Sequence, residues 1–348
     1  MRVLMIPADE TAHANPFNTL LNAALRAAGM TIESGTRGRG ALRKCDILHV
    51  HWPHNFASQA SLLQSIRGSI LLSGAVLYHK VRGARIVWTV HDDESLVKRH
   101  AWLEHILMDL FTRWVDGLVY FSERGRAIVE GRRPRLARKA SVIVPHGTYD
   151  GVYPEPEGRA RTRQELGLAD RFTLAFLGDV KAYKGVEHVL ELSRALGERA
   201  AVVIAGKFAD APYEQGLLRR IAAGEGGELT IIDHRLSDAE LARWIDASDV
   251  VLLPYGKSLN SGMGVLAIER GTRILATDQP AFLDMRDELG GYWVSCVDRW
   301  TDPEVFAPML AARESDADRA GRKAFLDRRR WSEIAAGYAG LYRKLTGR

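Results

Sequence analysis

The chain has 348 residues, of which 46% are hydrophobic and 26% charged, and its formal net charge is +5. This length and composition predict a globular protein of about two domains, each large enough for its own core. Cys45 and Cys296 lie far apart and form no Cys-x-x-Cys pair, which excludes a disulfide-rich scaffold and indicates a reducing, cytoplasmic compartment.

Short apolar runs alternate with helical spacers through the first half of the chain. Met1–Glu10 has too short an apolar run for a signal peptide and is typical of a first strand. Helices are expected at Asn18–Ala28 and Trp102–Trp114. Strands are expected near Arg2–Ile6, Asp46–His51, Arg85–His91, Gly117–Phe121 and Ala140–Val144. Alternation of this kind predicts a parallel sheet with helices on both faces.

Two of these strands end in polar or aromatic side chains. Asp46–Pro53 ends in His51 and Trp52, and Trp88–Glu94 ends in His91, Asp92, Asp93 and Glu94. The carboxyl ends of parallel strands are where ligands bind in such sheets. His91 and each acidic residue beside it could act as a general base, although helix capping and solvated charge would also explain the cluster.

One histidine of the first strand end is expected to be a satisfied core residue. His51 lies nearer the end of the strand than His49, so His51 is preferred as the residue that lines a binding cleft. Trp52 could stack on a sugar face or belong to the core.

Basic residues are concentrated in the first half. Residues 1–165 contain 23 Lys and Arg against 16 Asp and Glu, a balance of about +7. The excess gathers in Lys80–Arg85 and Glu123–Lys139, and includes Arg132, Arg133 and Arg135. A solvated helical face or an anionic membrane surface would account for it. Nucleic acid is a poorer partner, because the basic segment has no interleaved aromatic residues.

One further apolar run, Ser69–His79, is too short to cross a bilayer and is flanked by Arg67 and Lys80.

A second βα series follows the junction Pro145–Arg159. Its strands are expected near Phe172–Leu177, Ala201–Ala205, Leu229–Ile232, Val250–Tyr255 and Arg273–Ala276. After the first of them a loop carries Lys181 and Lys184, where two point charges could neutralise a diphosphate, although solvated loop charge explains most lysines. We expect Lys184 to bury little, so that its loss would barely change fold stability.

The segment Ser258–Thr277 is a strand end, a turn of small residues, a helix and another strand. Asn260, Ser261 and Gly262 form the turn, and an apolar helix follows at Gly264–Arg270. Free backbone N–H groups and the positive end of a helix dipole suit a phosphate or diphosphate, although the segment could also be an ordinary βα turn. A closing helix is expected at Trp331–Leu345.

The order of several motifs resembles GT-B glycosyltransferases. FLGDVKAYKGVEHVL, AVVIAG and LSDAELARWIDASDVVLLPYGKSLNSGMGVLAIERGTRILATD are similar to the donor half of the family-4 group. The resemblance is closer to bacterial exopolysaccharide mannosyltransferases of the xanthan β-mannosyltransferase type. ANPFNTLLNAAL, DILHVHWPH, RIVWTVHD and HGTYDGVY in the first half resemble the same group.

The chain also departs from the family-4 pattern. Leu266 and Ser258 occupy the places of the two glutamates found there, and Asp179 replaces the usual arginine. Asn260-Ser261-Gly262 instead matches the β-mannosyltransferase type, so the resemblance favours an inverting enzyme that uses GDP-mannose.

The resemblance implies two Rossmann-like doubly wound domains with a cleft between them. Residues 1–155 would bind the acceptor, residues 156–330 the nucleotide sugar, and 331–348 would form a helix that packs back on the first domain. The acceptor would be a lipid-linked or soluble glycan, and the enzyme would lie peripherally at the inner face of the cytoplasmic membrane.

In this interpretation each candidate residue has a role. The catalytic residues are His91, Asp93 and Lys184, and the diphosphate is held by Lys181, Lys184, Asn260, Ser261 and Gly262. The acceptor side is lined by His51, Trp52 and Asp92, and the nucleoside is met by Arg235 and Leu236. No metal ion and no cofactor are expected.

Other interpretations stay open. These are a retaining family-4-like transferase that uses a UDP- or GDP-sugar, and a GT-B module that binds nucleotide sugar without turnover. A single-domain GT-A enzyme with a metal at Asp92–Glu94 and a Rossmann dehydrogenase are weaker, the latter because no Gly-x-Gly-x-x-Gly turn follows the first strand.

Overall fold

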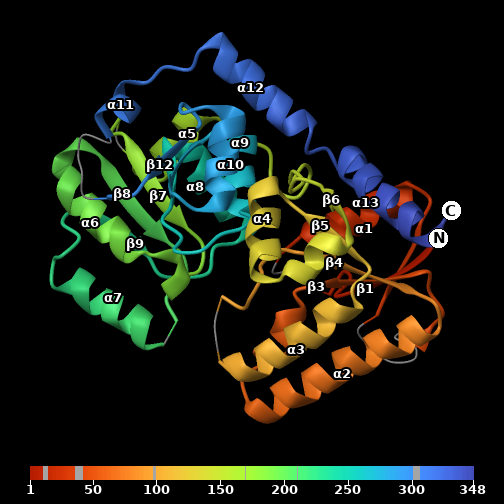
Figure 1. Cartoon of the computed structure of the whole chain (residues 1–348). Coiled ribbons are helices and arrows are strands. Elements are labelled where there is room, and N and C mark those ends of the chain that lie inside the picture. The colour runs from red at the N-terminus through yellow and green to blue at the C-terminus, as the bar shows by residue number, and fades with distance from the viewer. Residues whose placement is uncertain (11–14, 36–41, 97–98, 169, 210, 301–305) are drawn as a thin grey trace. The chain divides into compact units, whose positions relative to one another are not determined.

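The computed structural model describes residues 1–348 except 11–14, 36–41, 97–98, 169, 210 and 301–305 (Figure 1). The chain forms two compact units. The first comprises Met1–Gly147 and Arg328–Arg348, and the second comprises Thr148–Asp327. The unit boundary therefore falls eight residues before the predicted boundary at residue 155, and the C-terminal helix belongs to the first unit.

The first unit is built on a six-stranded parallel sheet. Its strand order is β2-β1-β3-β4-β5-β6. The strands are β1 (Arg2–Ile6), β2 (Thr31–Ser34), β3 (Ile47–His51), β4 (Arg85–Thr89), β5 (Gly117–Tyr120) and β6 (Ala140–Ile143). The chain moves from β1 to β2 on one side and returns to β3 on the other. The switch point of this sheet therefore lies between β1 and β3.

Helices cover both faces of this sheet (Figure 1). They are α1 (Phe17–Ala27), α2 (Leu62–Val81), α3 (Ala101–Trp114), α4 (Glu123–Arg132) and α13 (Trp331–Thr346). α1 and α13 pack together and close a core that contains Val3, Met5, Leu21, Tyr338 and Tyr342. α2 packs against α3 and β4.

The second unit repeats the plan with strand order β12-β11-β10-β7-β8-β9, again entirely parallel. The strands are β7 (Thr173–Leu177), β8 (Ala201–Ala205), β9 (Leu229–Ile232), β10 (Val250–Leu253), β11 (Arg273–Thr277) and β12 (Val294–Val297). The chain leaves β7 towards β8 and β9 and comes back to β10, so the switch point lies between β7 and β10.

Helices also cover both faces of the second sheet. Figure 1 shows α6 and α7 on one face and α8, α9 and α10 on the other. The helices of this unit are α5 (Arg159–Glu165), α6 (Glu187–Leu196), α7 (Pro212–Ala222), α8 (Asp238–Ala247), α9 (Gly262–Glu269), α10 (Pro280–Leu289), α11 (Phe306–Ala311) and α12 (Asp316–Asp327). None of the helices in the described part of the chain combines the length and apolarity that a membrane span requires.

Candidate functional site

The two loops at the switch point of the second sheet are packed against each other. Gly185 has a φ of 60°, and a Cβ atom there would lie 2.2 Å from the carbonyl oxygen of Pro254. The N–H of Gly256 donates to the carbonyl oxygen of Tyr183 at 2.8 Å. Only glycine allows this approach of backbone to backbone. The loop after β7 is thereby fixed to the loop after β10.

Lys184 ends the short 3-10 turn Ala182–Lys184 of this loop. Its Nζ lies 5.7 Å from the ring centre of Phe176 and 5.9 Å from that of Tyr255. Burial of the ammonium lowers the pKa of Lys184 to about 8, although Asp179 opposes the shift. Within the described residues the ammonium has no hydrogen bond and no ion pair. The side chain is half-buried, so the expectation that it buries little needs correction.

Lys184 was expected to bury little because nothing in the loop sequence indicates an aromatic lining. The rings come from β7 and from Tyr255, two residues after β10, and the close approach at Gly185 carries the lysine over them. Lys181 lies three residues earlier in the same loop and is half-buried as well.

The predicted phosphate-binding turn forms the N-terminus of α9. Ser261 caps this helix, because its hydroxyl accepts a hydrogen bond from the N–H of Gly264 at 3.1 Å. The helix begins at Gly262, two residues earlier than the sequence predicted. The side-chain oxygen of Asn260 is buried and has no hydrogen-bond partner among the described residues. The turn thus presents a positive helix end beside an unsatisfied amide.

The predicted nucleoside-binding residues follow β9. Arg235 is largely exposed and pairs with Asp179 at 2.6 Å, and Leu236 is half-buried. This ion pair links the loop after β9 to the loop after β7. Asp179 replaces the family-4 arginine. Its ion pair holds Arg235 at the carboxyl ends of the strands, where Lys184 also lies.

In the first unit, both strand-end histidines are buried. His49 shares hydrogen bonds with the hydroxyls of Tyr342 and Thr89, the latter at 2.7 Å, so it is a satisfied core residue. His51 is only 1% exposed, and its Nδ1 shares a hydrogen bond of 2.9 Å with Nε2 of His91. His51 was predicted to line a binding cleft, and this needs correction, because neighbouring rings cover it.

His91 lies in an aromatic cluster and not at an open strand end. Its ring is stacked on Trp52 with ring centres 4.0 Å apart, and meets Phe17 at 5.0 Å and Phe121 at 5.1 Å. Burial, and then the neighbouring histidines including His51 and His146, hold the pKa of His91 well below its usual range. The imidazole is neutral at pH 7, and its low basicity makes it a poor general base. One face of the Trp52 indole is occupied by this stacking on His91.

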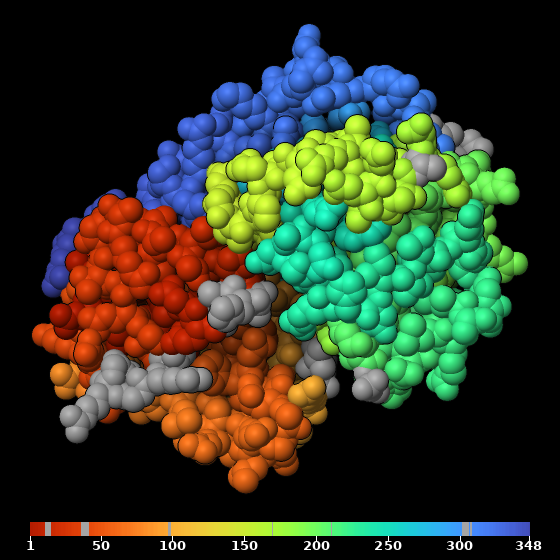
Figure 2. All heavy atoms as spheres, turned by 180° about the vertical axis from the view of Figure 1, so that it is seen from behind, coloured from red at the N-terminus to blue at the C-terminus, as the bar shows by residue number. Residues whose placement is uncertain are grey.

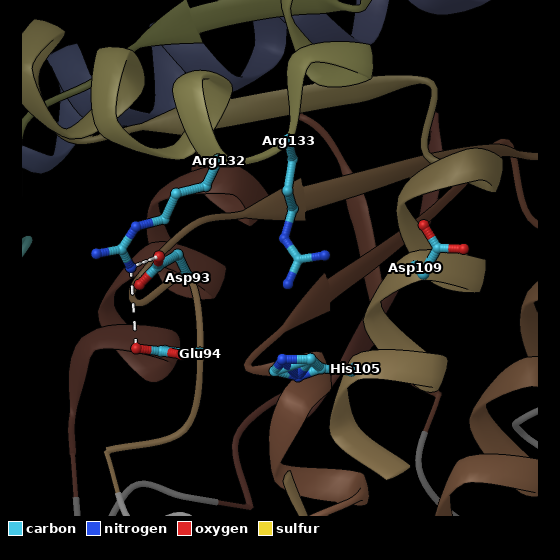
Figure 3. A pocket seen from close by; sticks show the side chains of 6 residues that line it. All are labelled: Asp93, Glu94, His105, Asp109, Arg132 and Arg133. Atoms are coloured by element: carbon cyan, nitrogen blue, oxygen red, sulfur yellow. Dashed lines mark hydrogen bonds and ion pairs between the residues drawn. The ribbon is translucent and has the colours of Figure 1, made fainter. Parts of the chain in front are cut away.

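Asp93 is placed differently, because it lines a cavity of about 390 Å³. Figure 3 shows the six lining side chains. They are Asp93, Glu94, His105, Asp109, Arg132 and Arg133. Arg132 forms an ion pair with Asp93 and lies 3.8 Å from Glu94. Arg133 and His105 lie between Asp93 and Glu94 on one side of the cavity and Asp109 on the other (Figure 3). Asp92, which was expected beside His51, is half-buried and does not line it.

The sequence did not reveal four members of these two clusters. Phe17 and His146 surround His91, and His105 and Arg133 line the cavity. Phe17 and His146 lie in the motifs ANPFNTLLNAAL and HGTYDGVY, so their positions in those motifs were the available signal. His105 lies on α3 and Arg133 directly follows α4, and nothing in the sequence around either residue indicates a functional role. In the described residues, no three His, Cys, Asp or Glu are grouped so as to hold a metal ion.

Comparison with known proteins agrees with this geometry. No family model matches the chain. Two curated relatives from strains of Xanthomonas campestris pv. campestris are both named GDP-mannose:glycolipid 4-beta-D-mannosyltransferase. They are 26% and 24% identical over 99% of this chain and 93% of their own length.

Solved structures share the fold over the whole chain. The chain is similar to sucrose-phosphate synthase from Thermosynechococcus elongatus, with a TM-score of 0.70 and 15% identity over 100% of this chain and 99% of that chain. It is also similar to Anabaena HepE in complex with UDP, with a TM-score of 0.69 and 12% identity over 99% of this chain and 100% of that chain. The chain is a GT-B glycosyltransferase.

The resemblance of this GT-B glycosyltransferase to the xanthan-type mannosyltransferases is confirmed by the two relatives. The doubly wound α/β fold is confirmed as well. Two six-stranded sheets exclude the single-domain GT-A alternative. The roles of individual residues stay predictions.

Proposed function

We propose that this glycosyltransferase transfers mannose from GDP-mannose to a lipid-linked oligosaccharide during exopolysaccharide assembly, with inversion and without a metal ion. The unpaired ammonium of Lys184 at the β7–β10 switch point is the observation that carries the proposal. A desolvated cation without a partner is unfavourable in the free protein and becomes favourable when a diphosphate neutralises it. The names of the two relatives support the donor and the glycolipid acceptor.

The donor site would use both loops of the switch point. The N-terminus of α9, with Asn260 and Ser261, would hold the diphosphate, while Lys181 and Lys184 neutralise charge on it. As the acceptor hydroxyl oxygen attacks the anomeric carbon, the bond from that carbon to the diphosphate breaks and GDP leaves. Two fixed cations would stabilise the developing negative charge without a metal ion. Arg235 and Leu236 would meet the nucleoside.

The acceptor side would use the cavity in the first unit. Both residues are buried, but Asp93 is a better candidate for the general base than His91, because Asp93 lines a cavity, where it pairs with Arg132, and His91 is an imidazole of low basicity enclosed by rings. The base would take the proton of the attacking hydroxyl. The arginines and carboxylates of the cavity suit the hydroxyl groups of a glycan. Association with the inner face of the cytoplasmic membrane would bring the enzyme to its lipid-linked acceptor.

A nucleotide screen tests this function. A ligand present at about a hundred times its dissociation constant adds about 2.7 kcal/mol of stability. We expect GDP to raise the melting temperature and UDP, at the same concentration, to leave it unchanged. Stabilisation by UDP alone would contradict the proposed donor. If GDP binds but GDP-mannose is neither hydrolysed nor transferred, the non-catalytic alternative would replace the enzyme.

A further inference from the structure

The apolar surface of the described chain is concentrated on two neighbouring helices. Nine large hydrophobic side chains are exposed there. Six belong to α2, two to α3, and the ninth is Leu42, whose carbonyl oxygen accepts a hydrogen bond from Tyr78 of α2 at 3.0 Å. The nine are Leu42, Leu62, Leu63, Ile70, Leu71, Leu77, Val81, Trp102 and Ile106. We call this surface the α2–α3 face, and apolar side chains gathered in one place mark an interaction site.

Helix α2 is apolar on its outer side as well as on its inner side. Leu72 and Val76 are buried with Ser65, Ser69 and His79, while Leu63 is 77% exposed and Val81 is 79% exposed. A helix that served only the core would carry polar residues on its exposed side. Figure 2 shows α2, among the orange spheres, on an outer surface of the first unit.

The charges on α2 have one sign, and the partly exposed carboxylate of α3, Asp109, is paired with Arg113 and Arg135. α2 carries no carboxylate over its 20 residues, and Arg67 lies exposed within the apolar stripe. Arg82 and Arg85 are exposed just beyond its C-terminal end, and the guanidinium of Arg82 lies 5.3 Å from the ring centre of Tyr78. Lys80 contributes little, because it is paired with Asp116. Exposed leucines bordered by arginines that have no carboxylate partner among the described residues match a surface of acyl chains under anionic headgroups.

The polar cavity adjoins this face through α3. His105 lines the cavity and lies between the exposed Trp102 and Ile106 in the sequence of that helix. A molecule with a polar head and an apolar tail could contact the polar cavity and the exposed apolar side chains along the same helix, α3. Trp102 is also the residue type that favours the boundary between lipid and water.

We propose that the α2–α3 face docks on the surface of an anionic lipid bilayer, with the leucines of α2 inserted among the lipids and Arg67, Arg82 and Arg85 on the headgroups. The docking would present the Asp93 cavity to a lipid-anchored acceptor. The functional role of this docking rests on the proposed glycolipid acceptor. The docking itself does not depend on which nucleotide sugar is the donor. The Arg132–Lys139 run is a weaker candidate, because Arg132 and Arg135 are paired with Asp93 and Asp109.

Vesicle flotation of the full chain tests the proposal. The parent is expected to float with vesicles of equal phosphatidylglycerol and phosphatidylcholine, and more weakly in high salt. The variant Ile70→Gln/Leu71→Gln/Leu77→Gln is expected to lose about 100-fold in affinity, since three apolar side chains no longer enter the lipid. The matched control Ile70→Val/Leu71→Met/Leu77→Met keeps the face apolar and is expected to bind as the parent does.

Other results would overturn the docking. If the glutamine variant floats as well as the parent, the face does not meet the bilayer. If the parent fails to float but is a dimer that the glutamine changes dissociate, a second copy of the chain occupies the face. Stabilisation by GDP is measured on all three proteins. It checks that each is folded and separates a failure of the docking from a failure of the proposed donor.

Discussion

Replacing Lys184 by methionine should raise the free energy of unfolding of the ligand-free protein and lower its turnover. Methionine keeps most of the side-chain volume over Phe176 and Tyr255 but removes the ammonium. The pKa of Lys184 falls from 10.5 to about 8 on folding. Each pKa unit corresponds to about 1.4 kcal/mol, so the charged lysine costs the native state at most about 3.5 kcal/mol. Because the residue is only half-buried, we expect a gain of about 1–3 kcal/mol.

The pH dependence follows from the sign of this shift. The folded protein releases the Lys184 proton more easily than the unfolded chain, so the destabilisation is fully present below pH 8. It disappears as the pH rises from about 8 to 10.5, where both states become neutral. Urea unfolding of the parent and Lys184→Met, followed by tryptophan fluorescence at pH 7 and at pH 10, should therefore show a difference that shrinks at the higher pH.

The same variant should lose transition-state stabilisation of about 2–4 kcal/mol, the scale of removing one preorganised charge from an active site. Turnover with GDP-mannose and the stabilisation by GDP should both fall. The matched change Lys181→Met is expected to be milder, because the two lysines share the charge. If Lys184→Met leaves turnover and GDP binding at parental values, or if it lowers stability at pH 7, the assignment of Lys184 to a diphosphate site is refuted.

Two further predictions concern metal independence and the support of α9. Turnover should survive excess EDTA, because two lysines and a helix end supply the positive charge; complete loss that Mn²⁺ or Mg²⁺ restores would instead indicate metal binding at Asp92–Glu94. Asp246→Ala should reduce the free energy of unfolding by about 3–5 kcal/mol, since it leaves Arg270 buried without its partner at 2.6 and 2.7 Å. In urea unfolding, a loss under about 1 kcal/mol would show that this pair does not anchor the end of α9.

The strands of both central sheets could be predicted from the sequence because each is a short, continuous apolar run. Val250–Leu253 is buried at every position, as parallel strands covered on both faces must be. The edge strands β2 and β12 were missed. Each has four residues, and neither is fully buried, since Thr31 is exposed and Cys296 is half-buried. Polar residues interrupt both runs, TIES and VSCV, whereas the other two edge strands, β6 and β9, keep enough apolar residues in ASVI and LTII to be predicted.

The donor loops could also be predicted, because their signal is local. A glycine after a strand, lysines in the next loop and a small-residue turn before a helix each specify a backbone geometry within a few residues. Asn260, Ser261 and Lys184 were singled out in this way, and their role in donor binding stays a prediction. The sequence could not tell that Lys184 is desolvated, because the rings that cover it come from β7 and from Tyr255, two residues after β10.

Residues whose role depends on burial were decided by the tertiary structure alone. His91 and Asp93 lie two positions apart, look equally able to take a proton and are equally buried, yet His91 packs against Phe17 and Phe121 while Asp93 lines the cavity and pairs with Arg132. Helix α2 is similar, because apolar residues occur all around it and the spacing does not say which side meets the core. The sequence by itself determined strands, turns and chain order, which depend on neighbours along the chain. Only the fold decided which charged side chains are desolvated and which leucines are exposed to solvent, because those properties depend on residues distant in sequence.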